Sequence, residues 1–92
     1  MDLKNTVNMM LSEDYKERFK AEYYQTKERY EKLKALNNKI DAANAMAMTV
    51  GNNKIEMPEH DCPDYLLVEQ QRKMGEYLHV LEVRAVIENI EL

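Results

Sequence analysis

Residues 74–92 of the chain read MGEYLHVLEVRAVIENIEL, and this stretch decides the fold because it is apolar on two opposite sides of a helix. On a helical wheel, the first stripe consists of Leu67, Met74, Leu78, Leu81, Ala85 and Leu92. The second stripe lies about half a turn away and consists of Val80, Val83, Val86, Ile87 and Ile90. A small monomer can cover one stripe with its own chain, and the other then needs a partner. The pattern predicts a homo-oligomer that assembles through the second stripe of the C-terminal helix.

The composition is typical of a protein made of long helices. The chain has 92 residues with two glycines, two prolines and no tryptophan, and 33% of its residues are charged. A compact fold of this length buries roughly 65% of its unfolded surface, and an elongated hairpin buries less. We therefore expect one small all-α domain whose stability depends on association.

Charge and cysteine content restrict the function and the compartment. The net charge is −4 with acidic and basic residues interleaved, which disfavours general nucleic-acid binding because counterion release needs clustered cations. The single cysteine, Cys62, excludes an intrachain disulfide and fits a reducing compartment. Residues 1–11 contain charges and asparagines that a signal peptide lacks, and no apolar run is long enough to cross a bilayer. We expect a cytoplasmic protein without membrane contact.

The first half of the chain predicts a short helix followed by a long one. Residues 1–11 have the apolar spacing of an amphipathic helix, or alternatively form an arm that docks only in an oligomer. Residues 12–48 are expected to form one helix with Ser12 as its cap and with i, i+4 ion pairs from Asp14 to Arg18 and from Glu28 to Lys32. Its coiled-coil-like seam consists of Tyr15, Phe19, Tyr23, Thr26, Tyr30, Leu33, Asn37 and Ile40.

Polar residues in the long helix carry two further expectations. Asn37 and Asn44 lie in line with the seam, where a buried asparagine fixes the register at a cost in stability. Tyr24 falls outside the seam, which indicates either an isolated exposed tyrosine or an interface anchor.

The second half predicts a loop over residues 49–62 and a helix over residues 63–90. Gly51 and the two asparagines after it favour a turn, and Ile55 and Met57 can tuck into the hairpin. Pro63 suits the first position of the last helix, where Asp61 or Asp64 can cap the free amides. The two long helices then form an antiparallel hairpin to which the short N-terminal helix is added.

Several stretches carry a likeness to a known group. They are residues 15–23 (YKERFKAEY), Cys62-Pro63 through Gln70-Gln71, residues 74–85 (MGEYLHVLEVRA) and residues 87–92 (IENIEL). The chain resembles small helical-hairpin proteins of Firmicutes phages and prophages that are related to a crAss-like phage protein, and it departs from them between Asn37 and His60. The group has no established activity, so the resemblance implies a setting: a phage accessory gene that serves counter-defence or host takeover in the host bacterial cytoplasm.

Catalytic and metal chemistry find little support in the residues. The stretch 59–62 reads Glu-His-Asp-Cys, but a tetrahedral zinc site needs four ligands, and we interpret it as a polar loop that caps the last helix. A metal shared across an oligomer axis is the alternative. A Cys62–His79 or Cys62–His60 pair is the one route to covalent catalysis, and no oxyanion-hole pattern accompanies it. We predict no catalytic residue, no metal ligand, no cofactor and no enzyme activity.

Four residues of the last helix are candidates for ligand binding. Arg84 and His79 border the second stripe from either side, Tyr77 lies near Arg84, and Arg72 lies near His79. Arginine offers a bidentate fork for phosphate or carboxylate, and an aromatic ring can stack on a base. The plainer alternative is that Arg84 pairs with Glu88 at i, i+4 and His79 lies on a rim.

Two functions of different classes follow. In the first, a homo-oligomeric sponge captures a small anionic ligand, such as a nucleotide signal of a bacterial immune pathway, at subunit junctions. In the alternative, a protein-interaction module inhibits a host defence protein, as an anti-CRISPR does, or serves as a phage assembly scaffold. The second stripe would then meet a foreign protein instead of a second copy.

Overall fold

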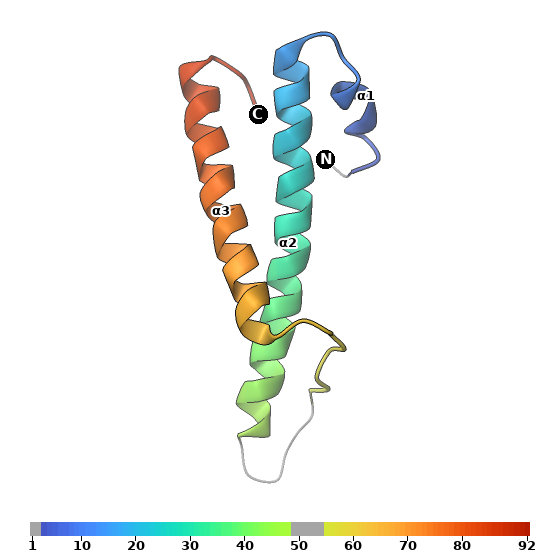
Figure 1. Ribbon diagram of the computed structural model, residues 1–92, viewed down its shortest axis with the longest axis vertical. Coiled ribbons are helices and arrows are strands. Elements are labelled where there is room, and N and C mark those ends of the chain that lie inside the picture. The colour runs from blue at the N-terminus through green and yellow to red at the C-terminus, as the bar shows by residue number, and fades with distance from the viewer. Residues whose placement is uncertain (1–2, 49–54) are drawn as a thin grey trace.

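The computed structural model describes residues 3–48 and 55–92, and within these ranges the regular secondary structure is all helix. It forms α1 (Val7–Met10), α2 (Tyr15–Ala47) and α3 (Asp64–Ile87), with no strand among the described residues. Figure 1 shows α2 and α3 side by side, running in opposite directions, so the predicted all-α helical hairpin is confirmed. The turn expected at Gly51 lies outside the described residues.

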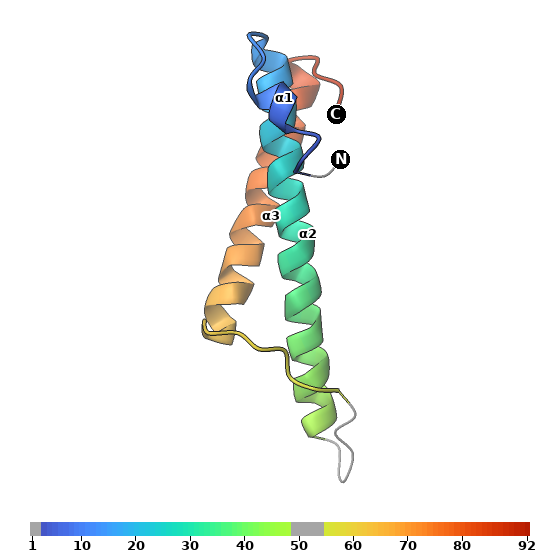
Figure 2. The ribbon, with the colours of Figure 1, turned by 90° about the vertical axis from the view of Figure 1, so that its right-hand side faces the viewer.

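The molecule is elongated. Its extents are 57 × 25 × 20 Å and its Cα radius of gyration is 17.3 Å, whereas a compact domain of this length has a radius of about 12 Å. Figures 1 and 2 together show α1 lying against α2 on the side opposite α3. Most of α3 therefore has a neighbour on one side only. No helix in the described part of the chain is long and apolar enough to cross a membrane.

The start of α2 differs from the prediction. Asp14, not Ser12, is the N-cap, because its backbone is extended and its carboxylate accepts the amide of Lys16 at 2.9 Å. Ser12 instead accepts the amide of Asp14 through its hydroxyl at 3.1 Å. Arg18 donates to the carbonyl of Ser12 at 2.7 Å, so the expected Asp14–Arg18 pair is replaced by this backbone contact. The predicted pair of Glu28 and Lys32 is present at 3.5 Å.

The core lies between the upper halves of α2 and α3 and is small. Its buried residues are Phe19, Tyr23, Leu78, Leu81, Ala85 and Ile90. Tyr23 donates its hydroxyl to Glu82 of α3 at 2.6 Å. Tyr24 is neither isolated nor fully exposed, since it packs against the core with its ring edge-to-face on Tyr23, 5.3 Å between centroids. Tyr15, expected in the seam, is exposed because it lies in the first turn of α2, at the end of the hairpin.

Asn37 sets the pairing of the lower half of the hairpin. It is buried, and its amide donates to the backbone carbonyl of Leu67 at 3.1 Å and to the side chain of Gln71 at 2.8 Å. A buried amide is satisfied at one register of α2 against α3, which is the role expected of a polar residue in a helical seam. Asn44 is exposed and does not share this role.

The second stripe is exposed except for its last member. Val80, Val83, Val86 and Ile87 are all exposed, the last two at 82% and 77%. Ile90, placed on this stripe by the helical wheel, is buried at 6%. The wheel fails there because α3 ends at Ile87. Asn89 then adopts a left-handed φ of 57°, and the amide of Ile90 bonds back to the carbonyl of Ala85 at 2.8 Å. This reversal turns Ile90 into the core and leaves Leu92 exposed.

The N-terminal segment docks on α2 and leaves the second stripe uncovered. Thr6 is fully buried; its hydroxyl donates to the carbonyl of Leu3 at 2.7 Å and accepts from Gln25 of α2 at 2.9 Å. These contacts hold α1 on the far side of α2 from α3 (Figure 1). The valines of α3 are therefore not covered by the chain's own N-terminal segment.

The segment before α3 carries two further corrections. Ile55 and Met57 are exposed rather than tucked into the hairpin, because the lower end of α2 offers them mainly small alanine side chains. Pro63 is the N-cap of α3, and no described side chain caps its amides. Asp64 instead accepts from the ring of His60 at 2.6 Å, and that ring also contacts the carbonyl of Pro58 at 2.9 Å.

Candidate functional site

The four arginines differ in what they contact, and this difference locates the candidate site. Arg72 donates to Glu69 and Glu76 of its own helix, and Arg84 donates to Glu88 at 2.8 Å. Arg18 donates through one nitrogen to a backbone carbonyl. Arg29 has no hydrogen bond or ion pair with any described residue. Two guanidinium groups, both on α2, are thus free of carboxylate partners in the described ranges.

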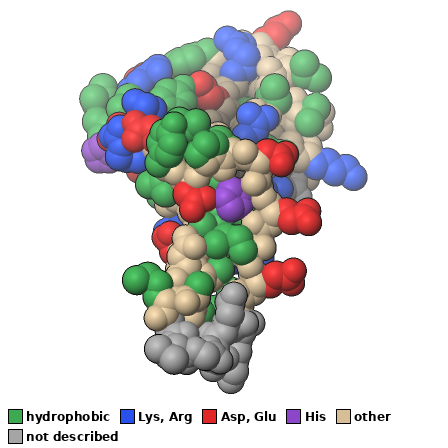
Figure 3. Space-filling model, turned by 60° about the horizontal axis from the view of Figure 1, so that its bottom comes forward, with side chains coloured by type: hydrophobic (Ala, Val, Ile, Leu, Met, Phe, Trp, Pro, Cys, Tyr) green, Lys and Arg blue, Asp and Glu red, His purple; other side chains and the backbone are tan. Residues whose placement is uncertain are grey.

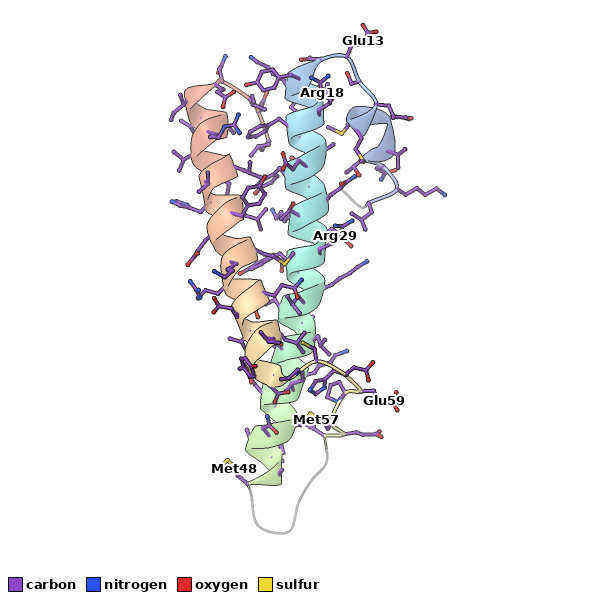
Figure 4. The ribbon with its side chains drawn as sticks, viewed as in Figure 1. Glu13, Arg18, Arg29, Met48, Met57 and Glu59 are labelled. Carbon is purple, nitrogen blue, oxygen red and sulfur yellow. The ribbon has the colours of Figure 1, made fainter. Side chains whose placement is uncertain are left out.

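Arg18 and Arg29 line the same hollow. Its volume is about 410 Å³, and its lining residues, which we call the arginine groove, are Met10, Arg18, Glu22, Gln25, Thr26 and Arg29. The five residues from α2 follow one another at helical spacing, so they share one face of that helix. Met10 of α1 closes the groove along one edge. Figure 4 shows Arg18 near the upper end of α2 and Arg29 further down the same helix.

The guanidinium groups of the groove can bind an anion through directional hydrogen bonds. A guanidinium group is always charged and presents a planar fork of donors that matches phosphate or carboxylate. The Thr26 hydroxyl adds a donor beside these forks. Gln25 is less available, since its amide is engaged by Thr6 and the sulfur of Met10.

Glu22 lies among these cations and is joined to α3. The hydroxyl of Tyr77 donates to its carboxylate, and this hydrogen bond to an anion raises the pKa of Tyr77, an effect that the nearby Arg84 partly opposes. Tyr77 thereby brings α3 to the edge of the groove. The site consequently combines two cations that lack a carboxylate partner among the described residues with one carboxylate that already accepts a hydrogen bond.

A second, apolar hollow begins on the other side of Tyr77. Its volume is about 510 Å³, and its lining residues, which we call the apolar hollow, are Cys62, Leu66, Glu69, Gln70, Lys73, Met74 and Tyr77. Leu66, Met74 and Tyr77 are among its apolar lining residues. The Tyr77–Glu22 hydrogen bond joins a lining residue of the apolar hollow to a lining residue of the arginine groove.

The four sequence-predicted ligand residues do not lie together. Arg84 and Tyr77 face α2: the guanidinium of Arg84 stacks on Phe19 with 4.9 Å to the ring centroid, and Tyr77 reaches Glu22. Arg72 lies twelve residues before Arg84, about 18 Å along the helix and about a third of a turn around it, where it is held between two glutamates. His79 is exposed. The ion pair of Arg84 with Glu88 is the plainer alternative that the sequence offered.

Sequence reasoning missed Arg18 and Arg29. The signal that could have found them is their spacing, because residues 18, 22, 25, 26 and 29 share one helical face. That face looks like an ordinary solvated side of a long helix until α1 is placed beside it. The docking of α1 through Thr6, which makes the face a groove, has no sequence signature of its own.

The opposite side of the hairpin is less suited to an anion. A hollow of about 210 Å³ lies there, and its charged lining residues are Lys27, Glu31 and Glu82. Lys27 lies over the ring of Tyr23, with its ammonium 5.8 Å from the centroid, and Glu82 accepts from the hydroxyl of Tyr23. The two carboxylates outnumber the single cation, so we place the candidate site in the arginine groove.

Metal binding and cysteine chemistry are the other possibilities that the sequence raises. In the described ranges, no three His, Cys, Asp or Glu side chains are placed to hold a metal ion. Cys62 lines the apolar hollow, and His60 is tied to Pro58 and Asp64. Figure 3 shows positive and negative side chains interspersed over the face that it presents, in keeping with the interleaved charges of the sequence.

The comparison with protein families identifies this chain. The model of the Sequestin family matches residues 13–87, a range that contains all of α2 and α3 and leaves out α1. The match covers well over half of the chain, so the protein belongs to the Sequestin family. No curated protein and no solved structure matches the chain.

Proposed function

We propose that this member of the Sequestin family binds and sequesters a small anionic ligand in the arginine groove, as a sponge does, without converting it. The family name itself denotes sequestration. The observation that carries the proposal is the pair of guanidinium groups, Arg18 and Arg29, that line one hollow without a carboxylate partner among the described residues. An acidic protein gains little from such a pair unless an anion binds to it.

The ligand class we favour is a nucleotide signal of a bacterial immune pathway. The resemblance to phage and prophage hairpin proteins supports this setting, in which a phage accessory protein acts in the cytoplasm of its host. Capture of the signal would lower its free concentration below the level that the host receptor needs. The effect is stoichiometric, so the protein must be present in amounts comparable to those of the signal.

We further propose that the protein works as a homo-oligomer. Val80, Val83, Val86 and Ile87 form an exposed apolar surface on α3, and such contiguous surfaces mark interaction sites. The elongated shape and small core also favour association. Arg84 and His79 flank this surface, so a second copy would bring a further arginine and histidine to the edge of the junction.

Calorimetric titration with nucleotides tests the proposal. Purified protein is titrated with a panel of oligonucleotide and ADP-ribose-type signals. A charge-assisted hydrogen bond contributes about 1.5–3 kcal/mol, so Arg29→Ala should weaken binding by roughly ten- to a hundredfold. Arg72→Ala is the matched control, since Arg72 lies outside the groove. Absence of binding across the panel would remove the proposal.

The exposed second stripe also favours a second candidate, an interaction module that inhibits a host defence protein or serves as a phage assembly scaffold. Light scattering of the purified protein separates the two. A stable homo-oligomer supports capture by a self-assembled sponge. A monomer that becomes stable when a host protein is added supports the interaction module.

A further inference from the structure

We infer that the site recognises its ligand in three parts: phosphate in the arginine groove, sugar hydroxyls at Glu22, and a base in the apolar hollow. This inference rests on the proposed function and adds to it the order of the groups and the residue that selects them. It follows from the Tyr77–Glu22 hydrogen bond, which joins a lining residue of the apolar hollow to a lining residue of the arginine groove.

Glu22 is the selecting residue. Its carboxylate lines the groove with Arg18 and Arg29, and among the described residues no ion pair joins it to either arginine. A carboxylate that lines the same groove repels the oxygens of a bare phosphate bound there. The same carboxylate accepts hydrogen bonds from hydroxyl groups. It therefore favours a ligand that carries hydroxyl donors beside its anionic group over an inorganic polyanion.

Tyr77 fixes where those hydroxyl groups bind. Its hydroxyl occupies one side of the Glu22 carboxylate and leaves the remaining acceptor positions for a ligand. The oxygen of Tyr77 can also accept a hydrogen bond, since its own hydrogen is directed to Glu22. A vicinal diol presents two adjacent donors to such a pair of oxygens, as a ribose does.

The apolar hollow then receives the group that follows the sugar. Leu66 and Met74 line it together with Tyr77, whose hydroxyl donates to Glu22 of the arginine groove. An aromatic base can lie against the Tyr77 ring and contact the sulfur of Met74. The order of cation, carboxylate and apolar wall along the site matches the order of phosphate, ribose and base in a nucleotide. This continuity commits the hollow to the base and not to a second copy of the chain.

Three probes of graded composition test the inference by calorimetry: adenosine diphosphate, ribose 5-phosphate and inorganic pyrophosphate. The wild-type protein should bind adenosine diphosphate most tightly and pyrophosphate most weakly. Glu22→Gln should weaken adenosine diphosphate and ribose 5-phosphate by about tenfold and tighten pyrophosphate by a few fold, because one charged acceptor is lost and one repulsion is removed. Glu76→Gln is the matched control, because it makes the same change outside the groove.

A second variant tests the base position. Met74→Ala should weaken adenosine diphosphate by roughly five- to tenfold through lost apolar contact and leave ribose 5-phosphate unchanged. Circular dichroism of each variant checks that the hairpin is retained.

The outcomes separate the inference from the function on which it rests. If the wild-type protein binds none of the three probes, and none of the nucleotide panel, the proposed function fails. If it binds nucleotides but prefers pyrophosphate, or if Glu22→Gln weakens all three probes alike, the inference fails and the proposed function stands. Unchanged binding of adenosine diphosphate by Met74→Ala, or a second copy filling the hollow, contradicts the base position.

Discussion

Tyr23 of α2 donates its hydroxyl to Glu82 of α3 at 2.6 Å, although 59 residues separate the two in the sequence. The bond lies at the edge of the core and joins the two helices that form the hairpin. Burial, with the hydrogen bond to Glu82 as the next cause, raises the pKa of Tyr23 to about 12. This contact makes the hairpin sensitive to alkaline pH in a way that can be measured.

The first prediction concerns this contact. Because the pKa of Tyr23 is raised on folding, its contribution to stability is fully present below the unfolded pKa of about 10 and is lost as pH rises toward the folded value of about 12. Tyr23→Phe should destabilise the protein by about 1 kcal/mol at neutral pH. Urea unfolding of the wild type and of Tyr23→Phe at pH 7 and pH 11 measures the free energy of unfolding of each. A gap between wild type and variant that widens at pH 11 would refute the assignment.

The second prediction concerns Asn37. Asn37→Ala removes a buried amide and leaves the carbonyl of Leu67 and the side chain of Gln71 without their partner, which should cost about 1–3 kcal/mol. Asn44→Ala, at an exposed position of the same helix, should change stability by no more than about 0.5 kcal/mol. Equal effects of the two substitutions in denaturant unfolding would contradict the role of Asn37 in the register.

The third prediction separates Ile90 from the rest of the second stripe. Ile90 is buried in the core, so Ile90→Ala should lower the free energy of unfolding by about 2–4 kcal/mol without changing which surface associates. Val83 is exposed, so Val83→Asp should leave the hairpin helical and dissociate the proposed oligomer. Circular dichroism and light scattering distinguish the effects. If Ile90→Ala and Val83→Asp both dissociate the oligomer and neither changes the free energy of unfolding, Ile90 belongs to the second stripe, as the helical wheel predicts.

The fourth prediction concerns the segment before α3. The ring of His60 faces a carbonyl at Nδ1 and a carboxylate at Nε2, an arrangement in which both nitrogens donate as imidazolium. The carbonyl of Pro58, followed by Asp64, raises the pKa of His60 above its ordinary value. The stabilisation is therefore present below about pH 6.5 and is lost as pH rises through the folded pKa.

Nuclear magnetic resonance titration measures this shift directly. Asp64→Asn should lower the pKa of His60, and the thermal midpoint of His60→Gln should fall short of wild type by more at pH 5.5 than at pH 9. The same difference at both pH values, or a His60 pKa below its ordinary range, would contradict a stabilising role for the contacts of His60 with Pro58 and Asp64.

The sequence predicts those parts of the fold whose residues recur at helical spacing. Phe19, Tyr23, Leu78, Leu81 and Ala85 were placed in the core correctly because helical spacing alone assigns them to facing sides. Ile90 was misplaced because a helical wheel assumes that the helix continues, and the left-handed turn at Asn89 ends that assumption. The reversal of the backbone depends on the single residue Asn89, so no periodic pattern in the sequence predicts it.

The candidate site was harder to predict for a related reason. Tyr77 and Arg84 were selected from a single helix, and the structure places both toward α2. The two arginines without a carboxylate partner among the described residues lie on the other helix, and only the docking of α1 turns their face into a groove. Spacing predicts part of this pattern, because Arg72 has a glutamate at i+4 and Arg29 has no acidic residue at i±3 or i±4. It fails for Arg18, which has acidic residues at i−4 and i+4 but donates to the carbonyl of Ser12 instead.

Equilibrium dialysis followed by recovery tests the central claim most directly. The protein is dialysed against a nucleotide signal that it binds in calorimetry, the retained fraction is released by heat denaturation, and the released molecule is analysed by chromatography. Sequestration in the arginine groove predicts that the ligand is retained in proportion to protein, is recovered chemically unchanged, and is not retained by Arg29→Ala. Recovery of a cleaved product, or equal retention by wild type and Arg29→Ala, would contradict it.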